Sequence, residues 1–131
     1  MKTICLISLG FVVCLCAGCG KAYPITSGGR TASAWAEVLQ APNEAVALRR
    51  KAATKLGPLV LIDEAAMPAL LLGLKDNDAG VRRLAVRSLG IYSGPRAEEV
   101  LPTLAELEHE EKDKKVREAL AAAIERLSNE N

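Results

Sequence analysis

The chain is poor in the residues that build disulfide frameworks, metal sites and aromatic cores. Its four cysteines all lie within the first 19 of 131 residues, so residues 20–131 contain no thiol. A disulfide framework needs cysteines spread through the folded part, and the apolar segment around these four is unlike a zinc knuckle. Aromatic residues make up only 3% of the chain, so we expect a core of Leu, Val, Ile and Ala.

An excess of charge of one sign is also missing. The chain has 17 basic and 16 acidic residues, a net charge of +1, which gives no general attraction to nucleic acid. Its single histidine, His109, lies in the charged run 108–113, which we expect to be an inter-helix loop. One His–Glu pair is not a metal site, and no glycine-rich phosphate loop follows a strand. We therefore expect no enzyme activity, no cofactor, no metal and no small-molecule substrate.

The N-terminus carries an uncharged apolar run. Met1 and Lys2 form a short positive start, and residues 3–17 follow without a charge. A membrane-spanning helix needs about 20 apolar residues, and this run is shorter. The pattern predicts a secretory signal peptide over residues 1–18, with an uncleaved membrane anchor as the alternative.

The end of this run resembles a bacterial lipoprotein signal. Ala17 and Gly18 fit its two small positions and Cys19 fits the modified cysteine, although Cys16 stands where Leu is usual. The resemblance implies cleavage after Gly18 and a lipid on Cys19, so that the mature protein is exported and anchored to a membrane of a bacterial cell envelope. Stable anchoring of this kind needs two or more acyl chains. Gly20 in place of an aspartate points, by the same resemblance, to the outer membrane.

The remaining chain divides into a linker and a helical part. Residues 19–32 contain several Gly, Ser and Pro residues, which predicts a flexible, lipid-anchored tether. Residues 33–131 are rich in Ala and Leu, and we predict helices over 33–40, 44–56, 64–74, 79–92, 96–108 and 114–127. Gly57 is an expected helix stop and Pro95 an expected first helical residue. The expected N-caps are Asn43, Asp63, Asp78 and Asp113.

An apolar stripe recurs with a period of 33–35 residues. The repeated segments begin at Leu48, Val81 and Val116, and in each an arginine follows the branched aliphatic residue. Further aliphatic residues stand four and eight positions later, which places one apolar stripe on a helix. Each unit also contains an earlier helix, since residues 67–71 parallel residues 101–105. One helix pair cannot bury its own apolar face, so we expect three stacked pairs to share a core.

This pattern resembles HEAT repeats, and more narrowly the short HEAT-like repeats of phycobilisome lyases. The likeness is carried by the run from Asp76 to Gly90: an acidic loop, then Val-Arg, then Ala, then Ser-Leu-Gly. It covers residues 33–128 and implies an all-α fold, an α-α superhelix of about three helix pairs. Tetratricopeptide repeats have a similar period, but the aromatic positions that they require are absent.

Basic residues lie at matching positions of two successive second helices. Arg50 and Arg83 share one repeat position, and Arg87 lies one helical turn beyond Arg83. By the resemblance, second helices line the concave face of the superhelix. We therefore expect a small basic strip that binds an acidic segment of a protein partner, with ordinary solvated helix surface as the alternative.

A second set of polar residues recurs once per repeat, with an arginine six residues after a loop residue that is acidic in two of the three repeats. The three pairs are Asn43 and Arg49, Asp76 and Arg82, and Glu111 and Arg117. HEAT-like and armadillo-like repeats use such residues to tie neighbouring repeats together. A planar guanidinium can bridge two loops through carboxylates and carbonyls, so we expect a structural ladder.

Together these features predict a membrane-anchored, exported repeat protein that acts as a non-catalytic protein–protein interaction module or scaffold. The expected contacts are an unknown protein partner and a membrane, the latter through the lipid on Cys19. The alternative is a lyase or lyase subunit, which the resemblance to phycobilisome-lyase-type repeats implies without a supporting residue. A purely structural spacer is a third reading that the sequence does not separate from the first.

Overall fold

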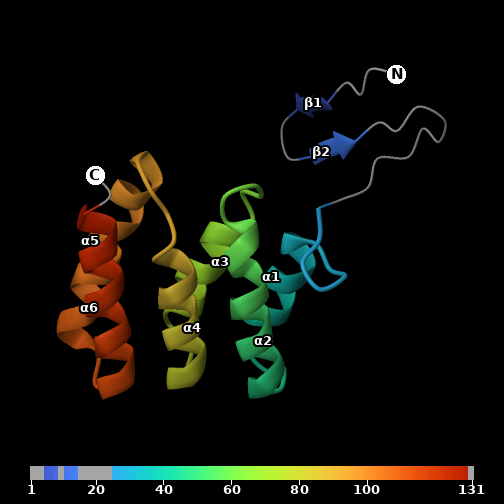
Figure 1. Cartoon of the computed structure of the whole chain (residues 1–131). Coiled ribbons are helices and arrows are strands. Elements are labelled where there is room, and N and C mark those ends of the chain that lie inside the picture. Colours follow the sequence, from blue (N-terminus) through green and yellow to red (C-terminus); the bar gives the residue numbers. More distant parts are fainter. Residues whose placement is uncertain (1–4, 9–10, 15–24, 130–131) are drawn as a thin grey trace.

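The computed structural model describes residues 5–8, 11–14 and 25–129. Six α-helices and one short 3₁₀ helix form its repeat domain: α1 (Ala32–Gln40), α2 (Val46–Leu56), η1 (Gly57–Leu59), α3 (Ala66–Gly73), α4 (Ala79–Leu89), α5 (Pro95–Glu110) and α6 (Lys114–Asn129) (Figure 1). The predicted all-α superhelix of three helix pairs is confirmed.

A short hairpin lies nearer the N-terminus. β1 (Cys5–Ser8) and β2 (Phe11–Cys14) pair antiparallel, with Cys5 opposite Cys14 in register. Both strands fall within the segment predicted as a signal peptide. The predicted cleavage position and Cys19 lie outside the residues that the structure describes.

The helices pack as three pairs in one row. α1 contacts α2, α3 contacts α4 and α5 contacts α6, while the second helices α2, α4 and α6 pack side by side (Figure 1). The shared core is mostly aliphatic, and its largest fully buried side chains include Leu56, Leu89 and Leu120 together with Trp35 and Tyr92. Burial of one such leucine contributes about 1.5–3 kcal/mol, so this shared apolar face holds the pairs together.

Two of the predicted N-caps are confirmed. Asp78 accepts the Val81 N–H at 2.9 Å at the start of α4, and Asp113 accepts the Val116 N–H at 3.0 Å at the start of α6. Each carboxylate satisfies a backbone donor that the first helical turn leaves free. α5 begins at Pro95 as predicted, because a missing N–H costs nothing at a first helical position.

Three other local predictions are wrong. α2 begins after Ala45, with no side-chain cap, so Asn43 is not its N-cap. Asp63 accepts the Ala65 N–H at 3.0 Å in the turn that precedes α3. Gly57 keeps right-handed helical backbone angles and continues into η1 instead of ending the helical path. Proline at the next position is tolerated there because the start of a helical turn needs no N–H from it.

The described part of the predicted tether is a tight turn docked on the first repeat. Ser27 and Arg30 pair across Gly28 and Gly29, whose φ angles of 61° and 80° favour glycine. The Trp35 indole N–H donates to the Ser27 carbonyl at 2.6 Å, and the Arg30 guanidinium lies 4.9 Å from the centre of the Trp35 ring. Residues 25–31 therefore differ from the flexible tether that composition predicts, because Trp35 ties them to α1.

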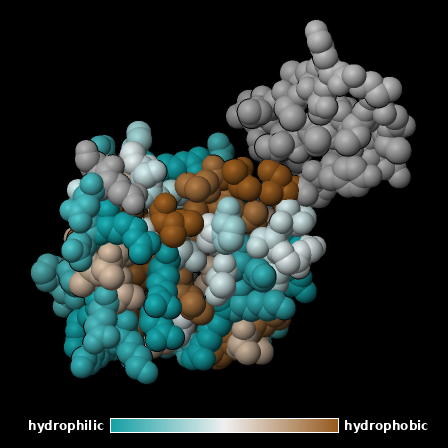
Figure 2. Space-filling model, viewed as in Figure 1, coloured by the Kyte–Doolittle hydropathy of each residue, from teal (hydrophilic) through white to brown (hydrophobic). Residues whose placement is uncertain are grey.

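The row of helix pairs has two different edges. The α1–α2, α3–α4 and α5–α6 loops lie at one edge, and the α2–α3 and α4–α5 connections lie at the other (Figure 1). We call the first the ladder edge, since it carries the predicted ladder residues, and the second the apolar edge. Figure 2 shows hydrophobic surface gathered at the apolar edge.

Candidate interaction surface

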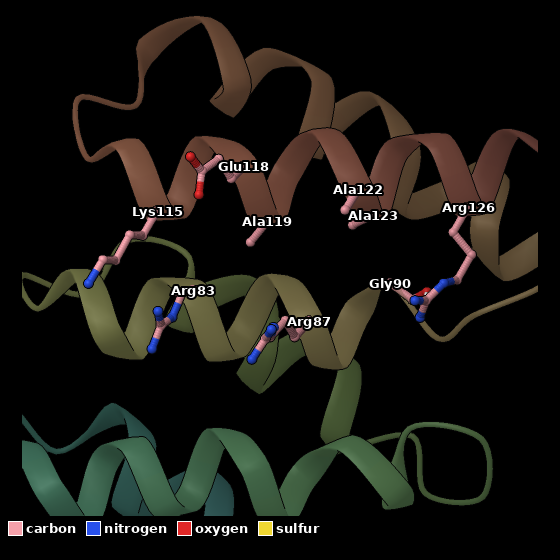
Figure 3. A pocket seen from close by; sticks show the side chains of 9 residues that line it. All are labelled: Arg83, Arg87, Gly90, Lys115, Glu118, Ala119, Ala122, Ala123 and Arg126. Atoms are coloured by element: carbon pink, nitrogen blue, oxygen red, sulfur yellow. The ribbon is translucent and has the colours of Figure 1, made fainter.

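A groove runs between the second helices of the last two repeats, α4 and α6 (Figure 3). Its volume is about 560 Å³. Small residues and long charged residues line it: Arg83, Arg87 and Gly90 from α4 and its C-terminal end, and Lys115, Glu118, Ala119, Ala122, Ala123 and Arg126 from α6. The alanines of α6 face α4 and leave open the space that longer side chains would fill.

The groove is basic. Its charged lining consists of four cations and one carboxylate: Arg83, Arg87, Lys115, Arg126 and Glu118. Glu118 lies 3.8 Å from the Lys114 Nζ in a solvent-exposed pair, whereas none of the four cations forms an ion pair with a described residue. The Arg83 Nε is buried and has no hydrogen-bond partner among the described residues.

Gly90 sets how closely α4 and α6 approach at one end of the groove. A Cβ atom on Gly90 would lie 2.9 Å from the Ala123 Cβ. Carbon atoms pack at about 3.5–4.0 Å, so a side chain at this position would push the two helices apart. The Gly90 carbonyl also accepts a long hydrogen bond of 3.5 Å from Arg126.

Arg50 does not join this basic surface as a free cation. Its guanidinium donates twice to Asp78, with Nε–Oδ1 and Nη2–Oδ2 distances of 2.8 Å each. These hydrogen bonds lower the pKa of Asp78 and raise the pKa of Arg50, so both groups stay charged and offset each other. This corrects the predicted strip: Arg83 and Arg87 line the groove, whereas Arg50 is paired and lies outside it.

The different behaviour of Arg50 and Arg83 has a local cause. Arg50 crosses Gly80 to reach its carboxylate partner, and a Cβ on Gly80 would collide with the guanidinium. The same position in the next repeat is Lys115, whose side chain extends toward the first turn of α4 (Figure 3). Arg83 forms no ion pair with Asp113, although Asp113 stands at the position equivalent to Asp78.

The ladder residues form two ion pairs at the ladder edge, each between successive repeats instead of between the residues that stand six apart. Arg49 donates to Asp76 through Nε at 2.8 Å and Nη2 at 3.1 Å. Arg82 donates to Glu111 through Nε at 2.8 Å and Nη2 at 2.9 Å. The Nη1 of each arginine donates to a carbonyl of its own loop, which for Arg82 is that of Asp76 at 2.8 Å. Each guanidinium therefore joins two successive repeat loops.

The two ends of the ladder lack one partner each. The side chain of Asn43 forms no hydrogen bond with a described residue, and Arg49 takes the Glu44 carbonyl in that loop. Arg117 donates to two carbonyls of its own loop, at 3.0 Å and 2.8 Å. Arg117 forms no ion pair with a residue in the described part of the chain.

The carboxylates of the two ion pairs are largely buried. The side chains of Asp76 and Glu111 are 9% and 4% exposed. Hydrogen bonding from Arg82 lowers the pKa of Glu111 from 4.5 to about 2. Burial alone would raise the pKa of Asp76, but hydrogen bonds from Arg49 and from the Asp78 N–H outweigh it and lower that pKa. Both carboxylates are therefore ionised at neutral pH and held by their arginines.

Sequence reasoning missed two groove cations, Lys115 and Arg126. Their signal lies in the helical period, because Lys115, Glu118, Ala122 and Arg126 follow one another at steps of 3, 4 and 4 residues and share one face. The repeat alignment hides them, since it places Glu118 and Ala122 at the two positions that are basic in the second repeat. Neighbouring positions of α6 complete the basic face instead of the equivalent ones.

Other candidate chemistry is absent from the part of the chain that the structure describes. These residues contain no cluster of His, Cys, Asp and Glu suited to a metal ion, and no described helix is long and apolar enough to cross a membrane. His109 lies exposed in the last turn of α5, which continues to Glu110, and not in a loop as predicted. Cys19, the predicted lipid-bearing residue, lies outside the described residues.

The chain matches a known family. The family model for HEAT repeats covers residues 32–125, which include five of the described α-helices and most of the sixth. A search of curated proteins finds no match. The two-helix period, the shared apolar core and the arginine pairs between successive loops agree with the family match. The chain belongs to the HEAT-repeat family.

Proposed function

We propose that this HEAT-repeat protein is a non-catalytic interaction module that binds an acidic segment of a protein partner in the groove between α4 and α6. HEAT-repeat modules often serve protein interaction, and the family match supports that general role. The specific proposal rests on the groove, where four cations and one carboxylate surround a row of alanines. Charge complementarity of this kind selects a partner and speeds its association.

The dimensions of the groove suit a polypeptide. Lys115 and Arg126 are 11 residues apart on α6, a distance of about 16 Å along a helix that rises 1.5 Å per residue. An extended segment of about five residues covers that length. The alanines let its backbone come close, while Arg83 and Arg87 offer planar guanidinium groups that pair with carboxylates through two hydrogen bonds.

The proposed function includes export and a lipid anchor on Cys19. The support is the uncharged N-terminal run that ends in Ala17, Gly18 and Cys19. We expect Cys19→Ser to release the protein from membranes or to leave its precursor unprocessed. Mass spectrometry of the mature chain is the direct measurement, and an N-terminus other than a lipidated Cys19 would contradict the anchor.

A photo-crosslinking amino acid at Ala122, inside the groove, tests the partner site in cells. Ala121 is the matched control, because it is an exposed alanine of α6 that does not line the groove. We expect position 122 to capture a protein that position 121 captures weakly or not at all. The double charge reversal Arg83→Glu with Arg87→Glu should abolish the crosslink, and added salt should weaken it by screening.

Urea unfolding of the reversed variant is the folding control. Crosslinking that survives charge reversal in a variant as stable as the wild type would show that the basic groove is only solvated surface. Equal capture at positions 121 and 122 would lead to the same conclusion.

A further inference from the structure

The apolar edge exposes large aliphatic side chains. Leu61 and Ile62 in the α2–α3 connection are 56% and 49% exposed, and Ile91, which follows α4, is 38% exposed. Single exposed aliphatic residues are common on folded proteins. Here they lie on two neighbouring connections, and Figure 2 shows hydrophobic surface, in brown, across this end of the molecule. We call Leu61, Ile62 and Ile91 the edge patch.

Contacts hold the two connections together. The guanidinium of Arg96, in the first turn of α5, donates to the Val60 carbonyl at 2.6 Å. Pro58 and Ile91 line one shared hollow of about 350 Å³ between the ends of α2 and α4. The two connections that carry the edge patch are therefore held side by side, and they come from two successive repeats.

Charge does not distinguish this edge. Arg87 lines the hollow together with Ile91, and Arg96 bonds the Val60 carbonyl, while Asp63 and Glu64 directly follow Ile62. Charges of both signs give no preference for an anionic partner or surface. What the edge offers is aliphatic area, which is stabilised by removal from water.

The N-terminal chain leaves the repeat domain at this same edge. Gly28 lies against the Lys55 side chain at the end of α2, and Ile25 packs on the core. Six residue steps separate Ile25 from Cys19. An extended chain spans at most about 3.6 Å per residue, so a lipid on Cys19 would lie within about 22 Å of Ile25.

We propose that the edge patch rests on the surface of the bilayer that holds the lipid on Cys19. This inference rests on the lipid anchor of the proposed function. The anchor keeps the patch at a high local concentration next to the bilayer, so a small apolar contact is enough to orient the domain. The ladder edge then points away from the membrane, and the groove between α4 and α6 runs outward from it, open to a partner.

The test places an environment-sensitive fluorophore on the patch. The chain has no cysteine after Cys19, so in the lipidated protein an introduced cysteine is the reactive thiol to label. Ile62→Cys carries the label on the patch, and Leu72→Cys is the matched control, since Leu72 is 53% exposed and lies on α3 away from the α2–α3 connection. The full chain is extracted from membranes and reconstituted into phosphatidylcholine vesicles that contain acyl-chain nitroxide lipid.

We expect the label at position 62 to shift to the blue and to lose most of its fluorescence to the nitroxide, while the label at position 72 keeps a solvent-like signal. Equal quenching at both positions, or none, would overturn the inference. A blue shift at position 62 without lipid quenching would overturn it too, because protein would then cover the patch. A mass spectrum with a free Cys19 would instead refute the anchor and the inference with it. Urea midpoints equal to that of the wild type establish that both labelled variants are folded.

Discussion

Arg82 in the second repeat and Glu111 in the third are joined by hydrogen bonds of 2.8 Å and 2.9 Å, although 29 residues separate them. The Arg82 Nη1 donates at the same time to the Asp76 carbonyl, so one side chain holds two loops. Without Arg82, a carboxylate that is only 4% exposed would lose its charged partner. Since an unpaired buried charge is costly, we expect the repeat array to be sensitive at this pair.

Replacement of Arg82 should therefore cost much more stability than replacement of its neighbour. We expect Arg82→Ala to lower the free energy of unfolding by about 1–3 kcal/mol. Arg83→Ala, the matched control one residue away, removes a side chain without an ion-pair partner among the described residues and should change it by no more than about 0.5 kcal/mol. Urea unfolding of both variants measures the difference. Equal midpoints, or a larger loss of stability in Arg83→Ala, would contradict the structural role of the ladder.

The pKa of Glu111 predicts where the protein loses stability in acid. That pKa is about 2 in the folded chain, against 4.5 for an unperturbed glutamate. Between these values the unfolded chain binds more protons, so the contribution of Glu111 is complete above about pH 4.5 and is lost as the pH falls toward 2. The free energy of unfolding should therefore fall as the pH is lowered through this range. Glu111→Gln should be less stable at neutral pH and lose less in acid, and identical slopes for variant and wild type would contradict the assignment.

Replacement of Tyr92 by phenylalanine should not lower the free energy of unfolding. Its side chain is fully buried, and its hydroxyl has no hydrogen-bond partner among the described residues. Tyr92→Phe removes this unsatisfied group at nearly the same shape, so the free energy of unfolding should stay equal or rise by up to about 1–2 kcal/mol. A loss of more than about 1 kcal/mol would mean that the hydroxyl has a partner.

The dependence of stability on pH at high pH gives an independent test of Tyr92. Burial raises its pKa from 10.0 to about 12. Between these values only the unfolded chain releases the phenol proton, so the wild type should lose stability as the pH rises from 10 to 12. The Tyr92→Phe variant should lose less over the same range, and parallel curves would contradict the raised pKa.

The spacing between α4 and α6 leaves no room for a side chain at Gly90. Gly90→Ala should lower the free energy of unfolding by about 1–3 kcal/mol, because the new Cβ would lie 2.9 Å from that of Ala123. Ala123→Gly removes the opposing atom, so the double variant should recover part of the loss. A double-mutant cycle from thermal or urea unfolding measures this coupling, and strictly additive effects would show that the two positions do not limit the helix spacing.

Replacement of Lys115 by a smaller residue should allow Arg83 to pair with a carboxylate of its own chain. In Lys115→Gly the path to Asp113 should open, as Gly80 opens the path that Arg50 takes to Asp78. The coupling between Arg83 and Asp113 should then rise from near zero to about 0.2–1 kcal/mol, the usual range for an exposed pair. Double-mutant cycles in the wild-type and Lys115→Gly backgrounds test this, and Lys115→Gln, which keeps a long side chain, should behave like the wild type.

Local sequence patterns were sufficient to predict the helix pairs. The stripes that begin at residues 48, 81 and 116 predict three helix pairs, because helical spacing alone places their aliphatic residues on one face. Asp78 and Asp113 are correct as N-caps because a cap acts within its own first turn. Asn43 and Asp63 fail because α2 and α3 begin after Ala45 and Ala65, two residues beyond the predicted caps.

For the ladder, the sequence predicts which residues take part, and the tertiary structure sets which of them pair. The sequence shows that an arginine follows a loop carboxylate at a fixed separation in the second and third repeats. Stacking of the repeats decided which groups meet: the Asp76 carboxylate binds Arg49 of the repeat before it, and only the Asp76 carbonyl binds Arg82 of its own repeat.

The same division holds for the groove. The repeat period in the sequence places Arg50 and Arg83 at equivalent positions. Their different surroundings follow from the folded chain, in which Arg50 is paired with Asp78 while Arg83 lines a basic groove with Lys115 and Arg126. Arg50 crosses Gly80, where a side chain would collide with its guanidinium, whereas Lys115 stands at the equivalent position of the next repeat, and helix packing sets which of these side chains meet.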